Sequence, residues 1–293
     1  MKVKQKNNGI SVEAPAKINL FLEVLGKRSD GYHEIETVIQ EIDLVDYLKF
    51  EEIEEGIRLE CEDKNIPLDE HNLIYKAAEL IQRECGVKKG ISIHLDKRIP
   101  VEAGLGGGSS DAAATLKALN LLWKIQLNDA ELMELAAKLG SDVAFFIKGK
   151  TSLCSGRGEK VSSLEVKEKM NYLVVFPHLK ISTATIYKSL NFDLTKNRKD
   201  ASFLTQMLRN ANAASIGKCL YNRLEEAIFA LYPELLRIKS SLECFNFCGL
   251  LISGSGSSIF GLCNDRNQAE TIKNEIELRG IGKVFVTTNT TTP

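Results

Sequence analysis

Hydrophobic and polar positions follow two different periods along the first half of the chain, which predicts a mixture of strands and helices. Residues 11–25 alternate closely enough to form a strand, and residues 37–53 indicate one or two more. From Asn72 to Cys85, apolar residues recur at the spacing of one helical face, and Gly86 supplies a stop. The pattern therefore predicts two long extended segments followed by an amphipathic helix.

Three shorter elements are expected next. Residues 91–95 predict a short strand, and residues 111–123 predict a helix rich in alanine. Asn128 and Glu131 have the spacing of a capping box, so a second helix is expected to start there and to end before Gly140.

The character of the sequence changes after residue 159. Charged residues dominate positions 160–170, so we expect two domains, at residues 1–160 and 161–293. The second domain is expected to contain strands at 172–176, 249–253, 258–263 and 282–287, several helices between 200 and 243, and a helix at 267–278. This order is that of an α/β plait. The polar tail 287–293 is expected to be disordered.

Charge is balanced, with 38 basic and 39 acidic residues and a net charge of −1. This balance gives no electrostatic reason to expect a nucleic acid or an anionic membrane as partner. We therefore expect small-molecule substrates only, and a monomer or a weak homodimer.

The cysteines and the start of the chain bear on its location. Seven cysteines are scattered without a Cys-x-x-Cys pair, which favours buried free thiols over a zinc site. The first eight residues lack an apolar signal core, and no run of 18 apolar residues occurs. These features predict a soluble protein of the cytoplasm.

The segment 100–111 carries the clearest chemical signal: Pro-Val-Glu-Ala-Gly-Leu-Gly-Gly-Gly-Ser-Ser-Asp. Glycine permits positive φ and close approach of the backbone to a ligand, and a helix that starts here directs unpaired N–H groups at it. Such a site binds anions, and phosphate is the expected occupant. The loop lacks the lysine of a Walker A motif, and Ser109 replaces the third glycine of a dinucleotide fingerprint. The alternative is a flexible turn with no ligand.

Three segments together resemble the motifs of the GHMP kinases. They are Ala14–Leu22 (Ala-Pro-Ala-Lys-Ile-Asn-Leu-Phe-Leu), the glycine loop at 100–111, and Ile252–Gly261 (Ile-Ser-Gly-Ser-Gly-Ser-Ser-Ile-Phe-Gly). The resemblance implies an α+β fold of two domains, one similar to the second domain of ribosomal protein S5 and one a ferredoxin-like α/β plait. It further implies an active site in the cleft between them and ATP as phosphoryl donor.

One branch of that family is matched more finely. Residues 28–34 (Arg-Ser-Asp-Gly-Tyr-His-Glu), 140–146 (Gly-Ser-Asp-Val-Ala-Phe-Phe) and 156–159 (Gly-Arg-Gly-Glu) resemble kinases that phosphorylate the 2-hydroxyl of 4-diphosphocytidyl-2-C-methyl-D-erythritol, in the non-mevalonate route to isoprenoids. The alternatives are another small-molecule GHMP kinase, of the mevalonate or homoserine kinase type, or an inactive nucleotide-binding regulator on the same fold.

Asp142 and Lys17 are the expected catalytic pair. By its position alone, Asp142 is a helix N-cap; the resemblance makes it the base that accepts the proton of the acceptor hydroxyl, and a substrate ligand. Ala144 stands where the branch commonly has proline. Lys17 lies within an apolar strand, so it is either an exposed edge lysine or buried and paired. The resemblance supplies Asp142 as its partner.

The resemblance places the substrate near Asn19, Tyr32, His33 and Tyr187. Tyr32 offers a ring face on which a cytosine stacks, and His33 can read its polar edge. The alternative for Tyr32 and His33 is a surface loop, and for Tyr187 a core position on a helix. Asn19 shares one strand face with Lys17.

The remaining expectations concern ATP. The resemblance implies contacts from Asn72, Lys97, Pro100, Gly104, Leu105, Gly106, Gly107, Gly108, Ser109 and Ser110. Asn72 is alternatively a helix N-cap, and Lys97 is expected to reach the phosphates or the ribose. Phosphoryl transfer from ATP generally needs Mg²⁺; Ser110 is a candidate hydroxyl ligand, and no acidic ligand can be placed. The second glycine-rich turn, 253–258, is either a plain hairpin or a part of the site near the acceptor.

Overall fold

The computed structural model describes residues 1–6, 9–190 and 198–290. Two compact units share these residues. Unit 1 comprises residues 1–16, 44–101 and 106–149, and unit 2 comprises residues 17–43, 102–105 and 150–293. The units follow spatial contacts rather than chain order, so the division into domains at residue 160 stays a prediction.

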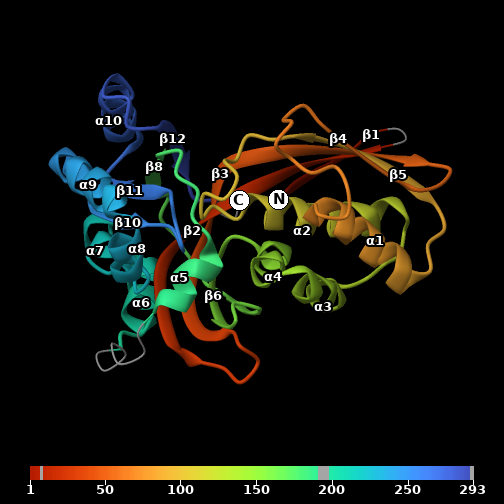
Figure 1. Cartoon of the computed structure of the whole chain (residues 1–293), viewed down its shortest axis with the longest axis horizontal. Coiled ribbons are helices and arrows are strands. Elements are labelled where there is room, and N and C mark those ends of the chain that lie inside the picture. Colours follow the sequence, from red (N-terminus) through yellow and green to blue (C-terminus); the bar gives the residue numbers. More distant parts are fainter. Residues whose placement is uncertain (7–8, 191–197, 291–293) are drawn as a thin grey trace. The chain divides into compact units, whose positions relative to one another are not determined.

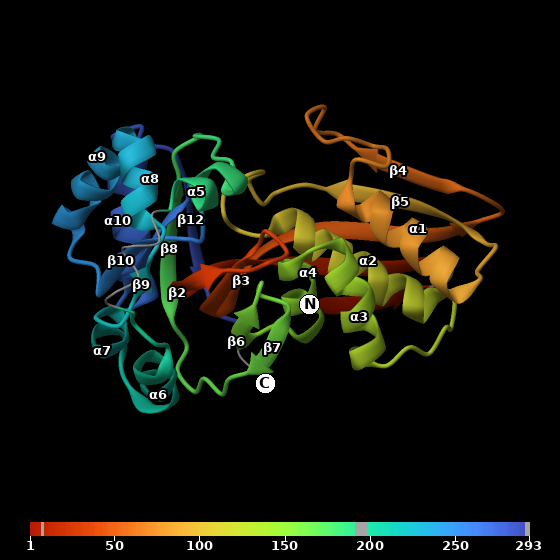
Figure 2. The ribbon, with the colours of Figure 1, turned by 60° about the horizontal axis from the view of Figure 1, so that its bottom comes forward.

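Unit 1 is a sheet with helices on one face (Figures 1 and 2). Its strands are β1 (Lys2–Lys6), β4 (Ile57–Cys61), β5 (Gly90–Asp96) and the parts of β2 (Gly9–Lys27) and β3 (His33–Ile53) that belong to this unit. Strand β1 runs antiparallel to β2, and β5 lies between β3, antiparallel, and β4, parallel. The helices are α1 (Leu73–Cys85), α2 (Gly107–Leu122), α3 (Asp129–Leu139) and α4 (Ser141–Lys148).

Local signals set the ends of these helices largely as expected. Asn72 caps α1, and Gly86 ends it in the left-handed conformation. The capping box of α3 is present. Helix α2 starts at Gly107 rather than at Asp111, because the left-handed Gly106 turns the chain directly into the helix. The sequence pattern missed α4, which follows α3 after the single residue Gly140.

Unit 2 contains the rest of the described chain. Its further strands are β6 (Thr151–Gly156), β7 (Lys160–Ser163), β8 (Asn171–Phe176), β9 (Tyr221–Asn222), β10 (Gly249–Ile252), β11 (Ile259–Cys263) and β12 (Lys283–Thr288). Its helices are α5 (Thr183–Ser189), α6 (Ser202–Asn210), α7 (Ala213–Gly217), α8 (Glu225–Leu231), α9 (Pro233–Leu242), the 3₁₀ turn η2 (Glu243–Phe245) and α10 (Arg266–Leu278).

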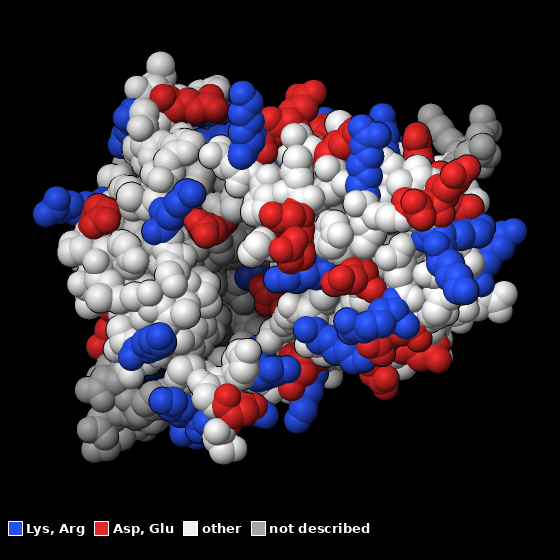
Figure 3. All heavy atoms as spheres, turned by 45° about the vertical axis from the view of Figure 1, so that its right-hand side comes forward, with Lys and Arg blue, Asp and Glu red and all other residues white. Residues whose placement is uncertain are grey.

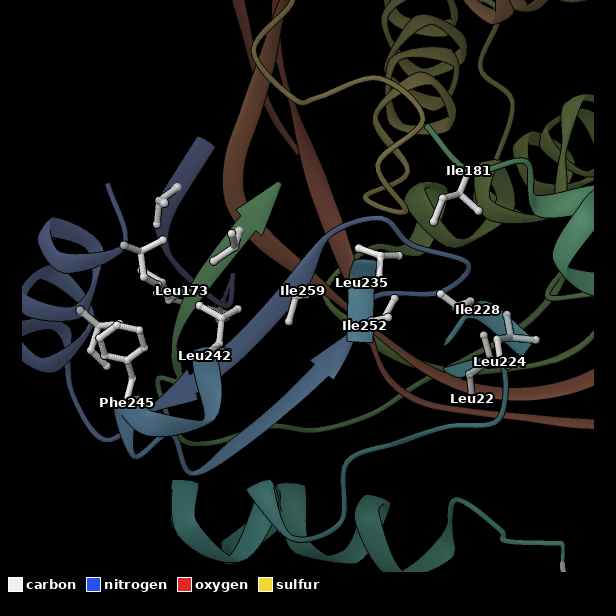
Figure 4. Packing of buried hydrophobic residues seen from close by; sticks show 14 of the residues in the cluster. Leu22, Leu173, Ile181, Leu224, Ile228, Leu235, Leu242, Phe245, Ile252 and Ile259 are labelled. Atoms are coloured by element: carbon white, nitrogen blue, oxygen red, sulfur yellow. The ribbon is translucent and has the colours of Figure 1, made fainter. Parts of the chain in front are cut away.

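The α/β plait in unit 2 is confirmed. Its sheet has the order β10-β11-β8-β12 with antiparallel neighbours, so the first strand of the motif lies inside the sheet. Figure 4 shows apolar side chains of this sheet, such as Leu173 and Ile259, in one buried cluster with Leu242 and Phe245 from the helical segment. Burial of this apolar surface is the main force that holds helices and sheet together.

Three expectations need correction. No strand was expected in the charged segment 160–170, but β7 lies there and pairs with β6. The tail is ordered through Asn289: Thr287 and Thr288 complete β12, and Asn289 accepts a hydrogen bond from the Met170 N–H. Residues 291–293 lie outside the described residues. Of the seven thiols only two are fully buried, those of Cys154 and Cys263, because the others lie on partly exposed elements.

Among the described residues, no helix combines the length and the apolar content that a membrane span requires.

Candidate active site

Three segments that are far apart in the sequence meet in unit 2. The N–H of Lys17 donates to the carbonyl of Leu105 (2.9 Å), and the Ser253 hydroxyl donates to the carbonyl of Gly104 (2.9 Å). The N–H of Asn19 donates to the same Ser253 hydroxyl oxygen (3.3 Å). The first motif, the glycine loop and the second glycine-rich turn therefore form one hydrogen-bonded junction.

Gly104 is required at this junction for two reasons. Its φ of +75° lies in the left-handed region, which side chains disfavour. A Cβ at this position would also collide with the carbonyl oxygens of Ser253 and Gly256. The glycine thus permits backbone to lie directly against backbone.

Lys17 and Asn19 lie beside the second glycine-rich turn. Each is only 4% exposed, so Lys17 is not an exposed edge lysine. The Lys17 ammonium donates to Asn19 Oδ1 (2.7 Å), and Asn19 Nδ2 donates to the Thr37 hydroxyl (2.9 Å). A Cβ on Gly254 would lie 3.0 Å from Asn19 Oδ1 and 3.4 Å from Lys17 Nζ. The strand face that carries both side chains is therefore in van der Waals contact with the turn.

The second glycine-rich turn is the hairpin between β10 and β11, and Asn222 holds it; its place near the acceptor stays a prediction. Asn222 Nδ2 donates to the carbonyls of Ile252 (2.9 Å) and Gly254 (2.7 Å). The Ser258 N–H donates to the carbonyl of Ala103 (3.1 Å). The role of Asn222 that these contacts support is a structural one.

The helix start of the glycine loop lies in unit 1. Gly106 is the N-cap of α2, with φ of +69°, and no side chain caps the helix. The first N–H groups of α2 are therefore not bound by a capping side chain. The Ser110 hydroxyl is fully buried and has no hydrogen-bond partner among the described residues. Both features are those of a site for an anion.

Lys97, which is expected to reach the phosphates or the ribose of ATP, is buried in a cluster of charged groups. Its side chain is 6% exposed, and its ammonium contacts the carboxylates of Asp46 and Asp111, the latter at 3.0 Å. Burial raises the pKa of Asp111 to about 8; Lys97 opposes this rise and Asp46 adds to it. Burial alone would lower the pKa of Lys97, but the two carboxylates raise it.

Sequence reasoning missed Asp46 and Asp111. A signal for Asp46 was present: it shares one face of β3 with Leu48 and Phe50, all three fully buried. A charged residue on the inward face of an alternating strand needs a partner, and that partner is Lys97.

For Asn72 and Asp142, the alternative to a role in the site is a helix cap, and the structure shows a cap for only one of them. Asn72 is a cap: its Oδ1 accepts from the Ile74 N–H (2.9 Å), and its Nδ2 donates to the carbonyl of Pro67 (2.7 Å). Asp142 is not a cap, because Gly140 is the N-cap of α4 and Asp142 lies within the first helical turn. The half-buried Asp142 is therefore retained as the candidate base.

An aromatic cluster in unit 2 gathers the expected cytidine residues. The Tyr32 ring is 54% exposed and lies 4.7 Å from the guanidinium of Arg157. The rings of His33 and Tyr187 contact each other at an interplanar angle of 33°, with centroids 5.1 Å apart. Burial, and then the charge of Lys27, lower the pKa of His33, so its imidazole is neutral at physiological pH. Tyr187 also packs against the core, as its alternative role implied, and its contact with substrate stays a prediction.

A tight turn orients Tyr32. Asp30 Oδ1 accepts from the Tyr32 N–H (3.1 Å), and the Arg28 guanidinium pairs with Asp30 (3.1 Å) and with Glu34. Side chain–backbone bonds of this kind fix short polar turns. The exposed ring of Tyr32 is thus held by its backbone rather than by packing.

Comparison with known proteins assigns the chain to a family. The models for the N-terminal and C-terminal domains of GHMP kinases match residues 72–150 and 204–281. A 4-diphosphocytidyl-2-C-methyl-D-erythritol kinase of Bacillus cereus (strain B4264) is 41% identical over 267 residues, which are 91% of this chain and 92% of the relative. The chain belongs to the 4-diphosphocytidyl-2-C-methyl-D-erythritol kinase family of GHMP kinases.

Further comparisons agree with this assignment to the GHMP kinases. A kinase of the same name from Pelotomaculum thermopropionicum is 44% identical over 264 residues, 90% of this chain and 92% of the relative. A crystal structure of 4-(cytidine 5'-diphospho)-2C-methyl-D-erythritol kinase superposes with a TM-score of 0.82 at 33% identity, covering 96% of this chain and all of the other. A homoserine kinase from Cytophaga hutchinsonii, at 22% identity and a TM-score of 0.76, shares the fold.

Proposed function

We propose that this GHMP kinase transfers the γ-phosphoryl group of ATP to the 2-hydroxyl of 4-diphosphocytidyl-2-C-methyl-D-erythritol. One observation carries the proposal: the first motif, the glycine loop and the second glycine-rich turn share a junction at Gly104, Leu105 and Ser253. The identity of 40–44% to kinases of that name, over most of the chain, supports the choice of acceptor.

The family implies ATP as donor, and we propose that backbone groups bind its phosphates. The start of α2 offers N–H groups and the positive end of a helix dipole. On the face that Figure 3 shows, basic and acidic side chains are interspersed, and the net charge of the chain is −1, so a local site rather than net charge has to bind the phosphates. The residues proposed to form the ATP site, by contact with the nucleotide or by support of the glycine loop, are Asn72, Lys97, Pro100, Gly104, Leu105, Gly106, Gly107, Gly108, Ser109 and Ser110.

We assign catalysis to Asp142 and Lys17. Asp142 would accept the proton of the 2-hydroxyl and orient its oxygen in line with the γ-phosphorus. Lys17, fixed by Asn19, would stabilise the negative charge on the transferring group. The transfer is direct: the bond from the acceptor oxygen to phosphorus forms as the bond to the leaving ADP oxygen breaks.

One residue of this chain is suited to the Mg²⁺ that the reaction is expected to need. The buried, unpartnered hydroxyl of Ser110 suits either a phosphate oxygen or Mg²⁺. When bound with ATP, Mg²⁺ would neutralise charge across the phosphates.

The acceptor's cytosine is assigned to the aromatic cluster. Tyr32 provides an exposed ring for stacking, while neutral His33, held against Tyr187, provides a donor and an acceptor for the polar edge of the base. Asn19 would position the polyol or a phosphate beside Lys17.

The decisive experiment incubates the protein with ATP, Mg²⁺ and the cytidine substrate, and detects the 2-phosphate product by mass spectrometry. Mevalonate and homoserine serve as competing acceptors. Faster phosphorylation of either would place the chain in another branch, and nucleotide binding without phosphorylation of any acceptor would make it a regulator. A chiral γ-phosphorus should be inverted; net retention would contradict direct transfer.

A further inference from the structure

A cluster of buried charges lies in unit 1 beside the glycine loop. Lys97, Asp46 and Asp111 form it, with side chains that are 6%, 0% and 3% exposed. The ammonium of Lys97 lies between the two carboxylates. No step of the proposed chemistry uses Asp46 or Asp111.

The cluster joins the two ends of the glycine loop. At the entry, Asp46 Oδ1 accepts from the N–H groups of Arg98 (2.6 Å) and Ile99 (2.8 Å), while Oδ2 holds Lys97. At the exit, Asp111 of α2 accepts from Lys97. One carboxylate thus fixes the strand end that leads into the loop, and one ammonium connects it to the helix that follows.

Lys97 also lies directly against the first residue of α2. A Cβ added to Gly107 would be 2.7 Å from Lys97 Nζ and 3.0 Å from Ile99 Cγ2. The ammonium therefore fills the space beside Gly107, where a side chain would otherwise lie. The position of Lys97 thus limits where the first residue of α2 can lie.

Stability alone is a poor reason for such a cluster. Buried charges lose their hydration, and apolar replacements of similar volume are often as stable or more stable. What an ion cluster provides instead is a fixed geometry, because each partner must stay within hydrogen-bond distance of the others.

We propose that Asp46 and Lys97 are positioning residues, which hold the entry and exit of the glycine loop at the separation that phosphate binding requires. This inference rests on the proposed function, and it refines the role of Lys97. The lysine acts from beneath the loop, through Gly107, rather than by contact with the nucleotide.

The two roles of Lys97 predict different outcomes for Asp46→Asn. If Lys97 positions the loop, Asp46→Asn and Lys97→Met should each weaken ATP binding by about 10- to 100-fold, because displacements near 1 Å have effects of that size. If Lys97 is itself a nucleotide ligand, Asp46→Asn leaves its charge in place and only Lys97→Met should weaken binding.

The test measures ATP affinity by calorimetry, together with KM for ATP and for the cytidine substrate. We expect a higher Kd and KM for ATP, and an unchanged KM for the cytidine substrate. The matched control is Lys239→Met in unit 2. The Lys239 side chain is 13% exposed, and its ammonium pairs with Glu225 (2.7 Å). As Asp46 does in the cluster, Glu225 also accepts a hydrogen bond from a backbone N–H, that of Ile252. This control should leave ATP affinity unchanged.

Three results would overturn the proposal: normal ATP affinity in Asp46→Asn, an equal loss in Lys239→Met, or an equal rise in KM for both substrates. If a single variant does not fold, the double variant Asp46→Asn/Lys97→Met removes both charges together and is expected to fold with weakened ATP binding. Failure of the double variant to fold would show that the cluster serves the fold alone. Calorimetry with ATP needs no acceptor, so a wrong acceptor assignment would leave this test intact.

Discussion

The two units present their candidate residues in opposite ways. At the start of α2 in unit 1, the groups assigned to the phosphates of ATP are backbone N–H groups and a buried hydroxyl. The charged side chains beside them are buried and paired with one another in the cluster of Asp46, Lys97 and Asp111. In unit 2 the groups assigned to the cytidine end are side chains, led by the exposed ring of Tyr32.

This difference follows the chemistry of the two ligand parts. Phosphate is recognised by several converging donors at fixed separations, which a helix start supplies only if its backbone is rigid. A base offers a flat π-face and a polar edge, which an exposed ring on a tight turn can meet. Variants should therefore separate the two substrates, and each test below is chosen to do so.

The largest effect is expected for Asp142→Asn. The amide cannot accept the proton of the acceptor hydroxyl, so kcat should fall by about 10²–10⁴-fold. Folding and ATP affinity should stay normal, because Gly140 rather than Asp142 is the N-cap of α4. Steady-state kinetics and calorimetry check this. A variant that keeps more than about a tenth of the wild-type kcat would refute the assignment.

Gly107→Val should weaken the binding of ATP only. The valine would press on Lys97 and Ile99, and overpacking of this kind costs about 1–3 kcal/mol, or about 5- to 150-fold in ATP affinity. Binding of the cytidine substrate should change little. Calorimetry with both ligands, with circular dichroism and a thermal melt as folding controls, gives the answer. A folded variant with normal ATP affinity would leave the glycines a role in the turn alone.

Tyr32→Ala should have the reverse selectivity. Loss of one stacked base costs about 1–3 kcal/mol, so KM for the cytidine substrate should rise by about 5- to 150-fold while KM for ATP stays unchanged. Tyr47→Ala is a matched control, since Tyr47 is also partly exposed beneath an arginine, Arg98, at 4.2 Å. An equal rise in both KM values would place Tyr32 in a general structural role.

The smallest effect on activity is expected for Glu23→Gln. Burial raises the pKa of Glu23, but hydrogen bonds from Arg223 (2.7 Å), Lys199 and Val24 outweigh this and lower it. A lowered pKa contributes stability above the unfolded-state value, which is lost as pH falls through the folded-state value. The stability difference between wild type and Glu23→Gln should therefore shrink on acidification.

Denaturant unfolding between neutral and acidic pH measures this difference, with turnover expected to stay unchanged. Glu270→Gln, which removes an exposed pair with Arg266 (3.3 Å), is the control, and its effect should stay below about 1 kcal/mol at every pH. A difference that grows on acidification would contradict the pKa direction for Glu23.

Elements with their own local signal were predictable from the sequence. Helices α1 and α3 carry caps at Asn72 and Asn128, and the plait follows from the order of its strands. Helix α4 was missed because it follows α3 after the single residue Gly140, and the short strand β9 because it pairs with the distant strand β2. Hydrophobic periodicity cannot report such contacts.

For the site, the residues of the first motif, the glycine loop and the second glycine-rich turn could be named from the sequence, but their partners could not. Asn222 precedes Gly254 by 32 residues in the sequence, and no local pattern links it to that turn. The burial of Lys97 could not be read from the sequence, because no local pattern links it to the carboxylates of Asp46 and Asp111 that surround it. Its expected contact with ATP stays a prediction.

The junction at Gly104 has a consequence for folding order and for dissecting the protein. The glycine loop is anchored by Ser253 and Ser258, which lie near the end of the chain. Contacts between segments so far apart must wait until most of the polypeptide has been synthesised and collapsed. A fragment truncated before the second glycine-rich turn would carry every residue of the loop yet lack the groups that fix Ala103 and Gly104. The loop is thus complete in sequence long before it is complete in structure.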